Sequence, residues 1–211
     1  MILSLDTTHE FGSVALTRDG ALVEEIALHS PDGFAHVIFA ELQALLRRHD
    51  CTLDRIECFA TAVGPGSFTG VRVGVACIKG LAEATARPVV GVSNLEALSA
   101  FGSRPLRAPV LDARRGEIYG AVYDAAGALL HDEVVAKLDV WLATLPDNVE
   151  FVSTDFAELG GRPVTPAPRA LAQAIGRIAW RKFRAGEAVD SARLDANYVR
   201  RSDAELFWKE S

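Results

Sequence analysis

The sequence predicts an α/β fold in which one βββαβα unit occurs twice. Hydrophobic residues make up 49% of the 211 residues, enough to build a buried core. Short apolar or alternating segments, typical of strands, are interspersed with segments whose apolar residues recur at helical spacing. The order of these segments begins again near residues 102–107, so we expect two lobes, residues 1–102 and 103–211.

The first lobe is predicted to begin with three strands. Segment 2–8 is largely apolar, segment 13–17 alternates, and Asp19-Gly20 marks a hairpin turn before segment 21–28. Apolar residues at helical spacing then predict a helix over residues 34–49. The remaining elements are a buried strand at 56–63, a helix at 71–86, a strand at 89–92 and a short helix at 95–101.

The second lobe repeats this order. Turn signals at Arg114-Arg115-Gly116 and Ala125-Ala126-Gly127 separate three predicted strands. A short helix, a strand and a long amphipathic helix follow. We expect these strands at 108–112, 117–123, 129–135 and 149–153, and the helices at 138–145 and 170–184.

Composition argues against several classes of protein. A net charge of −6 disfavours a protein that binds nucleic acid by itself, because phosphate contacts need a basic surplus. No apolar run approaches the roughly 20 residues that span a bilayer, and the first residues lack the basic region of a signal peptide. The three cysteines form no C-x-x-C pair, and Cys58 and Cys77, in apolar surroundings, are expected to be small buried side chains. We therefore expect a cytoplasmic protein without a membrane contact.

The first candidate functional segment is Asp6-Thr7-Thr8 at the end of the first predicted strand. An acidic residue followed by hydroxyls in a turn can hold a metal–phosphate group through hydroxyl and backbone N–H donors. The same two threonines can instead satisfy the turn itself, which is the simpler interpretation.

The second candidate segment is the glycine-rich loop at residues 64–70, between a buried strand and a helix. Backbone N–H groups at such a junction can face an anion. However, no G-K-[ST] follows the glycines, so the loop is not a P-loop. The third glycine, Gly70, also comes one residue too late for G-x-G-x-x-G. A close-packed backbone junction would explain the glycines equally well.

Four stretches resemble the TsaB family, also called YeaZ. The longest is GPGSFTGVRVG at residues 64–74. The opening ILSLDTT at 2–8 is similar to the family's first strand, and DARRGEIY at 112–119 to its second-half hairpin. The stretch Tyr198-Val199-Arg200, with Ala204-Glu205, is similar to its C-terminal motif.

This resemblance implies an actin/Hsp70-like (ASKHA) fold in two small lobes, which agrees with the repeated order of elements. It also implies a non-catalytic subunit that works with the catalytic homologue TsaD and the ATPase TsaE. In that system the adenosine next to the anticodon of ANN-reading tRNAs receives a threonylcarbamoyl group. The chain would form a heterodimer with TsaD and contact tRNA only through the complex.

The resemblance extends the list of candidate nucleotide contacts. In actin-like ATPases the turn corresponding to residues 112–115 approaches nucleotide phosphates, although an exposed charged turn is an equal alternative. No tightly bound cofactor is expected, and ATP or ADP at the subunit junction is the candidate ligand. The candidate contacts are Asp6, Thr7, Thr8, Gly64, Gly66, Ser67, Asp112 and Arg114.

The two long helices of the first lobe are candidates for the partner contact. Their apolar residues cover more than one narrow stripe, so one face can pack on the sheet and another on a partner. Deep burial within the chain would produce the same pattern. In the family these helices contact TsaD, and they can self-associate into a homodimer when TsaD is absent. The candidate interface residues are Val37, Ile38, Leu42, Leu45, Val75 and Ile78.

The first long helix lacks the metal ligands of the catalytic relative. That relative binds its metal with an H-x-x-x-H pair, whose two histidines lie one helical turn apart. Here His36 is followed four residues later by Ala40. We therefore expect no metal site and no catalysis by this chain. The alternatives are a stand-alone actin-like ATPase or kinase and, less favoured, a peptidase.

Overall fold

The computed structural model describes residues 1–199, and within them the chain forms two compact units. Unit 1 comprises Met1–Ala97 and Pro168–Ala196. Unit 2 comprises Leu98–Ala167 and the described residues from Asn197 onward. This division differs from the predicted lobes 1–102 and 103–211, because the last long helix belongs to unit 1.

Unit 1 is built on a five-stranded sheet in the order β3-β2-β1-β4-β5. The first three strands are antiparallel neighbours, and β4 and β5 extend the sheet in parallel. All five residues of β1 and of β4 are buried, because both strands lie inside the sheet and are covered on both faces. The strands are β1 Ile2–Asp6, β2 Phe11–Arg18, β3 Ala21–His29, β4 Cys58–Ala62 and β5 Val89–Val92.

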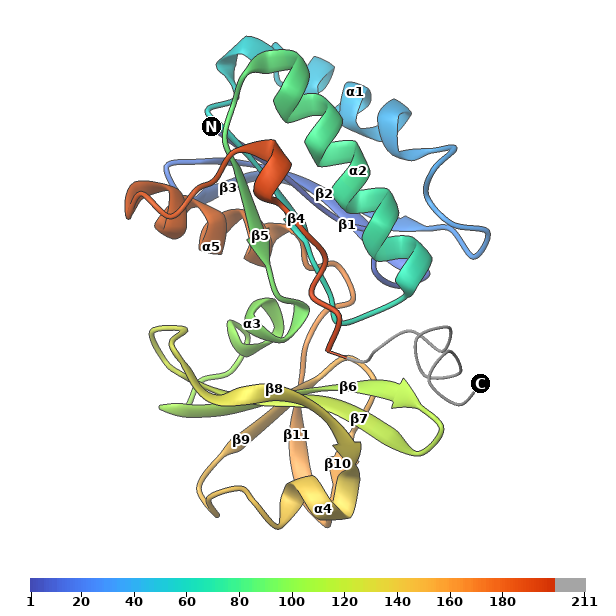
Figure 1. The fold of residues 1–211 in the computed structure, drawn as a ribbon, viewed down its shortest axis with the longest axis vertical. Coiled ribbons are helices and arrows are strands. Elements are labelled where there is room, and N and C mark those ends of the chain that lie inside the picture. Colours follow the sequence, from blue (N-terminus) through green and yellow to red (C-terminus); the bar gives the residue numbers. More distant parts are fainter. Residues whose placement is uncertain (200–211) are drawn as a thin grey trace, which may run out of the picture. The chain divides into compact units, whose positions relative to one another are not determined.

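Helices cover both faces of this sheet (Figure 1). The helices α1 (Ile38–Arg48) and α2 (Phe68–Thr85) lie on one face, and α5 (Ala172–Arg184) lies on the other. The short helix α3 (Asn94–Ser99) follows β5. Two 3-10 turns, Leu53–Arg55 and Ser191–Arg193, complete the regular structure of the unit.

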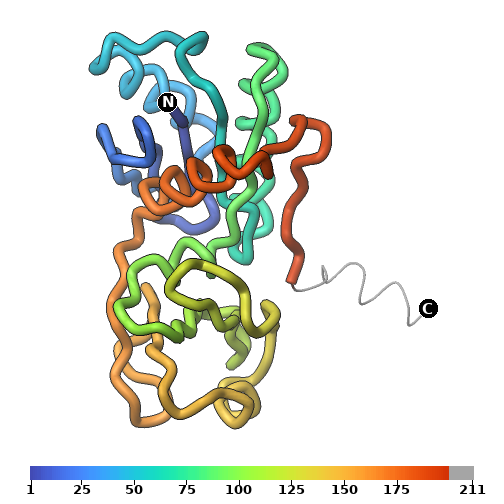
Figure 2. The backbone as a smooth tube through the Cα atoms, turned by 90° about the vertical axis from the view of Figure 1, so that its left-hand side faces the viewer, coloured from blue at the N-terminus to red at the C-terminus, as the bar shows by residue number. Residues whose placement is uncertain are grey.

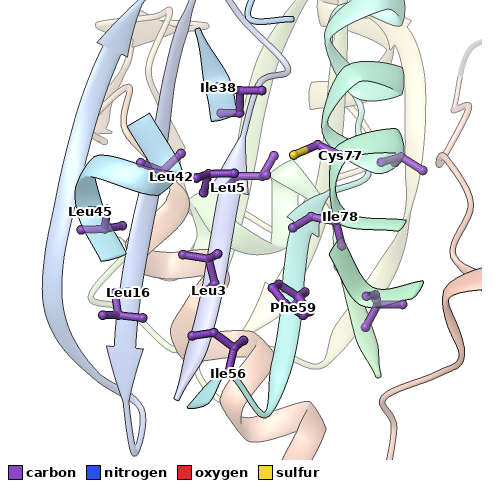
Figure 3. Packing of buried hydrophobic residues seen from close by; sticks show 14 of the residues in the cluster. Leu3, Leu5, Leu16, Ile38, Leu42, Leu45, Ile56, Phe59, Cys77 and Ile78 are labelled. Atoms are coloured by element: carbon purple, nitrogen blue, oxygen red, sulfur yellow. The ribbon is translucent and has the colours of Figure 1, made fainter. Parts of the chain in front are cut away.

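The core between the sheet and α1 and α2 contains most of the residues predicted to form a partner interface. Figure 3 shows Ile38, Leu42, Leu45 and Ile78 pointing onto the sheet, where Leu3 lies beneath them. The exposed fractions of these four helix residues are 1%, 3%, 0% and 0%. Their side chains are therefore not available to a partner, which corrects the prediction for them. The same holds for Val75, which is 9% exposed, whereas Val37 is only partly buried.

The opposite face of the sheet meets α5 through small and polar side chains. The Ser13 hydroxyl accepts a hydrogen bond from Ala172 N (2.9 Å), and the Ser4 hydroxyl donates one to the Ala172 carbonyl (2.8 Å). Both serines are fully buried. Figure 2 shows α5 lying against the N-terminal strands, although it follows them by more than 140 residues. The predicted amphipathic helix is thus present, and its partner is the first sheet.

Unit 2 is built on a six-stranded sheet in the order β10-β11-β9-β6-β7-β8. Trp141 of helix α4 (Leu138–Leu142) packs with Phe151, Val110 and Ile118 in its core. The strands are β6 Leu106–Arg114, β7 Glu117–Asp124, β8 Leu129–Lys137, β9 Glu150–Ser153, β10 Glu158–Leu159 and β11 Arg162–Pro166.

Glu150 joins three segments of unit 2. Its carboxylate accepts hydrogen bonds from Ser103 N (2.7 Å), Arg104 N (2.6 Å) and the Thr165 hydroxyl (2.7 Å). Burial acts to raise the pKa of Glu150, but these hydrogen bonds outweigh it and hold the pKa below its usual value.

Several element boundaries differ from the predicted ones. Helix α1 begins at Ile38 rather than residue 34, because Phe34 lies in the core at the start of a preceding turn. Helix α2 begins at Phe68, so the last three residues of the predicted loop 64–70 belong to its first turn. Among residues 1–199 no helix is long and apolar enough to cross a membrane. The three cysteines are free and buried.

Candidate functional site

The candidate site of unit 1 begins at the turn between β1 and β2. Asp6, Thr7 and Thr8 are 1%, 2% and 3% exposed. The Asp6 carboxylate accepts hydrogen bonds from Thr8 N (2.9 Å) and from the Thr8 hydroxyl (2.6 Å). The turn is therefore held by its own acidic and hydroxyl groups, as in an Asx-turn.

The electrostatics of Asp6 follow from its burial. Removal from water raises the pKa of Asp6 above its ordinary value, because burial penalises the charged form. The hydrogen bonds from Thr8 and Asn94 and the nearby His9 act in the opposite direction without cancelling the effect of burial. Burial therefore leaves the Asp6 carboxyl group with a higher proton affinity than an exposed aspartate has, although its hydrogen bonds favour the charged form.

The glycine-rich segment packs directly onto this turn. Ser67 N donates to the Thr8 carbonyl (2.7 Å), and the Thr7 hydroxyl donates to the Gly70 carbonyl (2.7 Å). A Cβ at Gly66 would approach the Thr8 carbonyl oxygen to 2.8 Å. At Gly70 a Cβ would fall even closer to the Thr7 carbonyl oxygen, well inside the 3.0 Å that real Cβ atoms keep. These glycines are required because the two backbones touch.

Ser67 is the N-cap residue of helix α2. Its hydroxyl accepts a hydrogen bond from Gly70 N (3.3 Å) and so caps the helix. Gly74 lies one turn after Gly70. It faces the hydroxyls of Thr7 and Thr61 at distances that leave no room for a side chain. The close-packed backbone junction, one of the two interpretations that the sequence allowed for this loop, therefore accounts for the glycine spacing.

Asn94 completes the site and was not identified from the sequence. Its Nδ2 donates to the Thr8 hydroxyl (2.7 Å), and its Oδ1 accepts from Gly64 N (3.2 Å). Asn94 N also donates to the Gly64 carbonyl (2.9 Å), and the residue is 2% exposed. A lone asparagine between a strand and a helix carries no recognisable spacing, so only the fold reveals its role.

The structure brings six of the eight candidate nucleotide contacts together in unit 1. Asp112 and Arg114 belong to the β6–β7 hairpin of unit 2. There Asp112 Oδ1 accepts from Arg114 N (2.7 Å), and Asp112 N donates to Asp155 Oδ2 (3.0 Å). Arg114 has φ 65°, so it forms part of a tight hairpin turn. A contact of this pair with nucleotide stays a prediction.

The outward faces of α1 and α2 present a second candidate site. Phe39 is 58% exposed and Phe68 is 44% exposed. Along α2, Ala76 and Gly80 are also exposed, and a Cβ at Gly80 would meet nothing within 4 Å. We call Phe39, Phe68, Ala76 and Gly80 the outer face of these two helices.

Metal ligands do not cluster in the part of the chain that the structure describes. Within residues 1–199 no three His, Cys, Asp or Glu side chains are arranged to hold an ion. His36 lies exposed in the turn before α1. The C-terminal motif residues Arg200, Ala204 and Glu205 lie outside the described residues.

Comparison with known proteins identifies the family. Residues 32–178 match the family model described as TsaD, tRNA N6-adenosine threonylcarbamoyltransferase. The chain is 34% identical to a Bacillus subtilis protein named tRNA threonylcarbamoyladenosine biosynthesis protein TsaB, over 67% of this chain. That match covers 62% of the relative, so the aligned part is shorter than two thirds of its length.

Solved structures support the same assignment. YeaZ from Pseudomonas aeruginosa superposes with a TM-score of 0.80 at 27% identity and covers 93% of this chain and 98% of its own. An activator of 2-hydroxyisocaproyl-CoA dehydratase from Clostridium difficile, with bound ADPNP, superposes with a TM-score of 0.51 at 9% identity. It covers 88% of this chain and 97% of its own, and it supports the fold alone.

These comparisons confirm the predicted actin-like α/β fold. The family model matches well over half of the chain, and the TsaB and YeaZ relatives extend the match to sequence and to three-dimensional structure. The chain therefore belongs to the TsaD family, as one of its TsaB/YeaZ members.

Proposed function

We propose that this chain is a non-catalytic partner subunit in the threonylcarbamoyladenosine modification of tRNA. It would bind a TsaD homologue, which modifies the adenosine next to the anticodon of ANN-reading tRNAs, and would work with a TsaE ATPase. The family assignment supports this role, since the named relatives act in the same biosynthesis. In this proposal the complex works in the cytoplasm and the chain meets tRNA only as part of it.

The observation that carries the proposal is the outer face of α1 and α2. Large apolar rings at Phe39 and Phe68 are exposed there, and Ala76 and Gly80 allow another backbone to approach closely. Exposed aromatic residues beside small residues are features of a helix-packing surface. The proposed interface residues thus differ from the buried residues that the sequence suggested, but they belong to the same two helices.

The experiment pairs two substitutions on exposed helix positions of unit 1. Ala76→Arg adds a charge to the outer face. Gln173→Arg adds the same charge at an exposed position of α5, on the other side of the sheet. We expect Ala76→Arg to weaken binding of the TsaD homologue at least 100-fold, because an unpaired charge buried in an interface is costly. Gln173→Arg should leave binding unchanged. Binding is measured by isothermal titration calorimetry.

Reconstituted tRNA modification tests the assigned role. TsaD homologue, TsaE, donor and tRNA should yield modified adenosine, measured by mass spectrometry, only when this chain is added. Robust modification or ATP turnover by the isolated chain would refute the non-catalytic role. Equal binding by both arginine variants would move the interface away from the outer face.

A further inference from the structure

A buried polar network joins three elements of unit 1 at one point. Asp6 ends β1, Thr8 lies in the following turn, and Asn94 begins α3. The Thr8 hydroxyl donates to Asp6 at 2.6 Å and accepts from Asn94 at 2.7 Å. All three side chains are at most 3% exposed, so each depends on the others for its hydrogen bonds.

The same turn supports the first turn of α2. Ser67 N donates to the Thr8 carbonyl at 2.7 Å, and Gly70 lies against the Thr7 carbonyl without room for a side chain. Because backbone meets backbone here, α2 has no flexible side chains between itself and the turn. A shift of the turn must therefore displace the start of the helix.

Helix α2 transmits this position to the outer face. It runs without interruption from Phe68 to Thr85. At 1.5 Å per residue, Ala76 lies about 13 Å from Ser67 along the axis. A packed helix moves as a rigid element, so its anchored start determines where Ala76 and Gly80 are presented.

Burying a carboxylate in this network has an energetic cost that apolar side chains would avoid. A fully satisfied polar network instead permits a single geometry, because each donor has one correctly placed acceptor. We propose that Asp6, Thr8 and Asn94 are positioning residues that set the N-terminal end of α2 and, through it, the outer face offered to the partner. This inference rests on the proposed function for its partner, but its local effect can be measured on the chain alone.

The test compares Thr8→Val with Thr8→Ser. Valine has nearly the shape of threonine without its hydroxyl, whereas serine keeps the hydroxyl. In the isolated chain we expect hydrogen exchange at Ser67 N and Val71 N to be at least tenfold faster in Thr8→Val than in Thr8→Ser. Exchange at Ile175 N, in α5 on the other side of the sheet, should be equal in the two variants.

A second measurement connects the network to the partner. Thr8→Val should bind the TsaD homologue at least tenfold more weakly than Thr8→Ser, while Thr8→Ser stays near wild type. Should Thr8→Val fail to fold, Asn94→Ala removes the second hydrogen bond to the hydroxyl and takes its place. Equal exchange at Ser67 N with and without the hydroxyl bonds overturns the inference. Absence of wild-type binding overturns the proposed function instead, since the exchange measurement still decides the role of the network.

Discussion

Two glycines of helix α2 should respond in opposite ways to the same substitution. Gly80→Ala adds a methyl group to open space, so only the helix propensity changes, and alanine is favoured over glycine by about 1 kcal/mol. Gly70→Ala places the methyl group against the Thr7 carbonyl oxygen. That neighbour is backbone, so the overpacking cost should reach about 3 kcal/mol, the upper end of its range. The propensity gain of about 1 kcal/mol offsets part of this cost.

The net expectation is a stabilisation of about 1 kcal/mol for Gly80→Ala and a loss of about 2 kcal/mol for Gly70→Ala. For a chain of this size the gap of about 3 kcal/mol corresponds to roughly 6–12 °C in Tm. Because the chain has two units, the free energy of unfolding should be followed in unit 1 itself, by hydrogen exchange of its sheet amides in urea. A Gly70→Ala variant as stable as wild type would refute the close contact between α2 and the turn.

Two buried carboxyl groups give predictions of opposite sign for the effect of pH. The pKa of Asp6 is raised, so its contribution to stability is full below its ordinary value of 3.8 and is lost as pH rises through the raised pKa; Asp6→Asn should therefore gain stability relative to wild type as the pH is raised above 3.8. The pKa of Glu150 is lowered, so its contribution is present above its ordinary value of 4.5 and is lost as pH falls. Glu150→Gln should cost about 2 kcal/mol at pH 7 and progressively less below pH 4.5. Urea denaturation across this pH range checks both, with exposed Glu158→Gln as the control; a pH-independent difference from wild type would contradict either prediction.

Most of the strands were predictable because their signals are local. Segment 2–8 is largely apolar, and Asp19-Gly20 marks the hairpin turn between the second and third strands. The structure has β1, β2 and β3 at these places. The strands β10 and β11 were missed, because a two-residue and a five-residue strand around Gly160-Gly161 are too short to show alternation.

The site was only partly predictable because its connections are not local. The glycine spacing identified the segment 64–70, but only the contact with Thr7 and Thr8 explains it. Helical periodicity revealed the apolar residues of α1 and could not tell whether the sheet or a partner covers them. In the structure the sheet covers Ile38, Leu42 and Leu45, and Phe39 is left exposed.

The late position of α5 in the chain has a consequence during synthesis on the ribosome. The hydrogen bond from the Ser4 hydroxyl to the Ala172 carbonyl cannot form until the chain has been extended by 168 residues beyond Ser4. Until α5 has emerged, one face of the first sheet, including fully buried Ser13 and Thr17 at 1% exposure, has no cover. Unit 2 is translated during this interval, so its strands can pair before α5 packs on the sheet of unit 1. Nascent chains arrested before residue 172 should therefore engage chaperones through that open face.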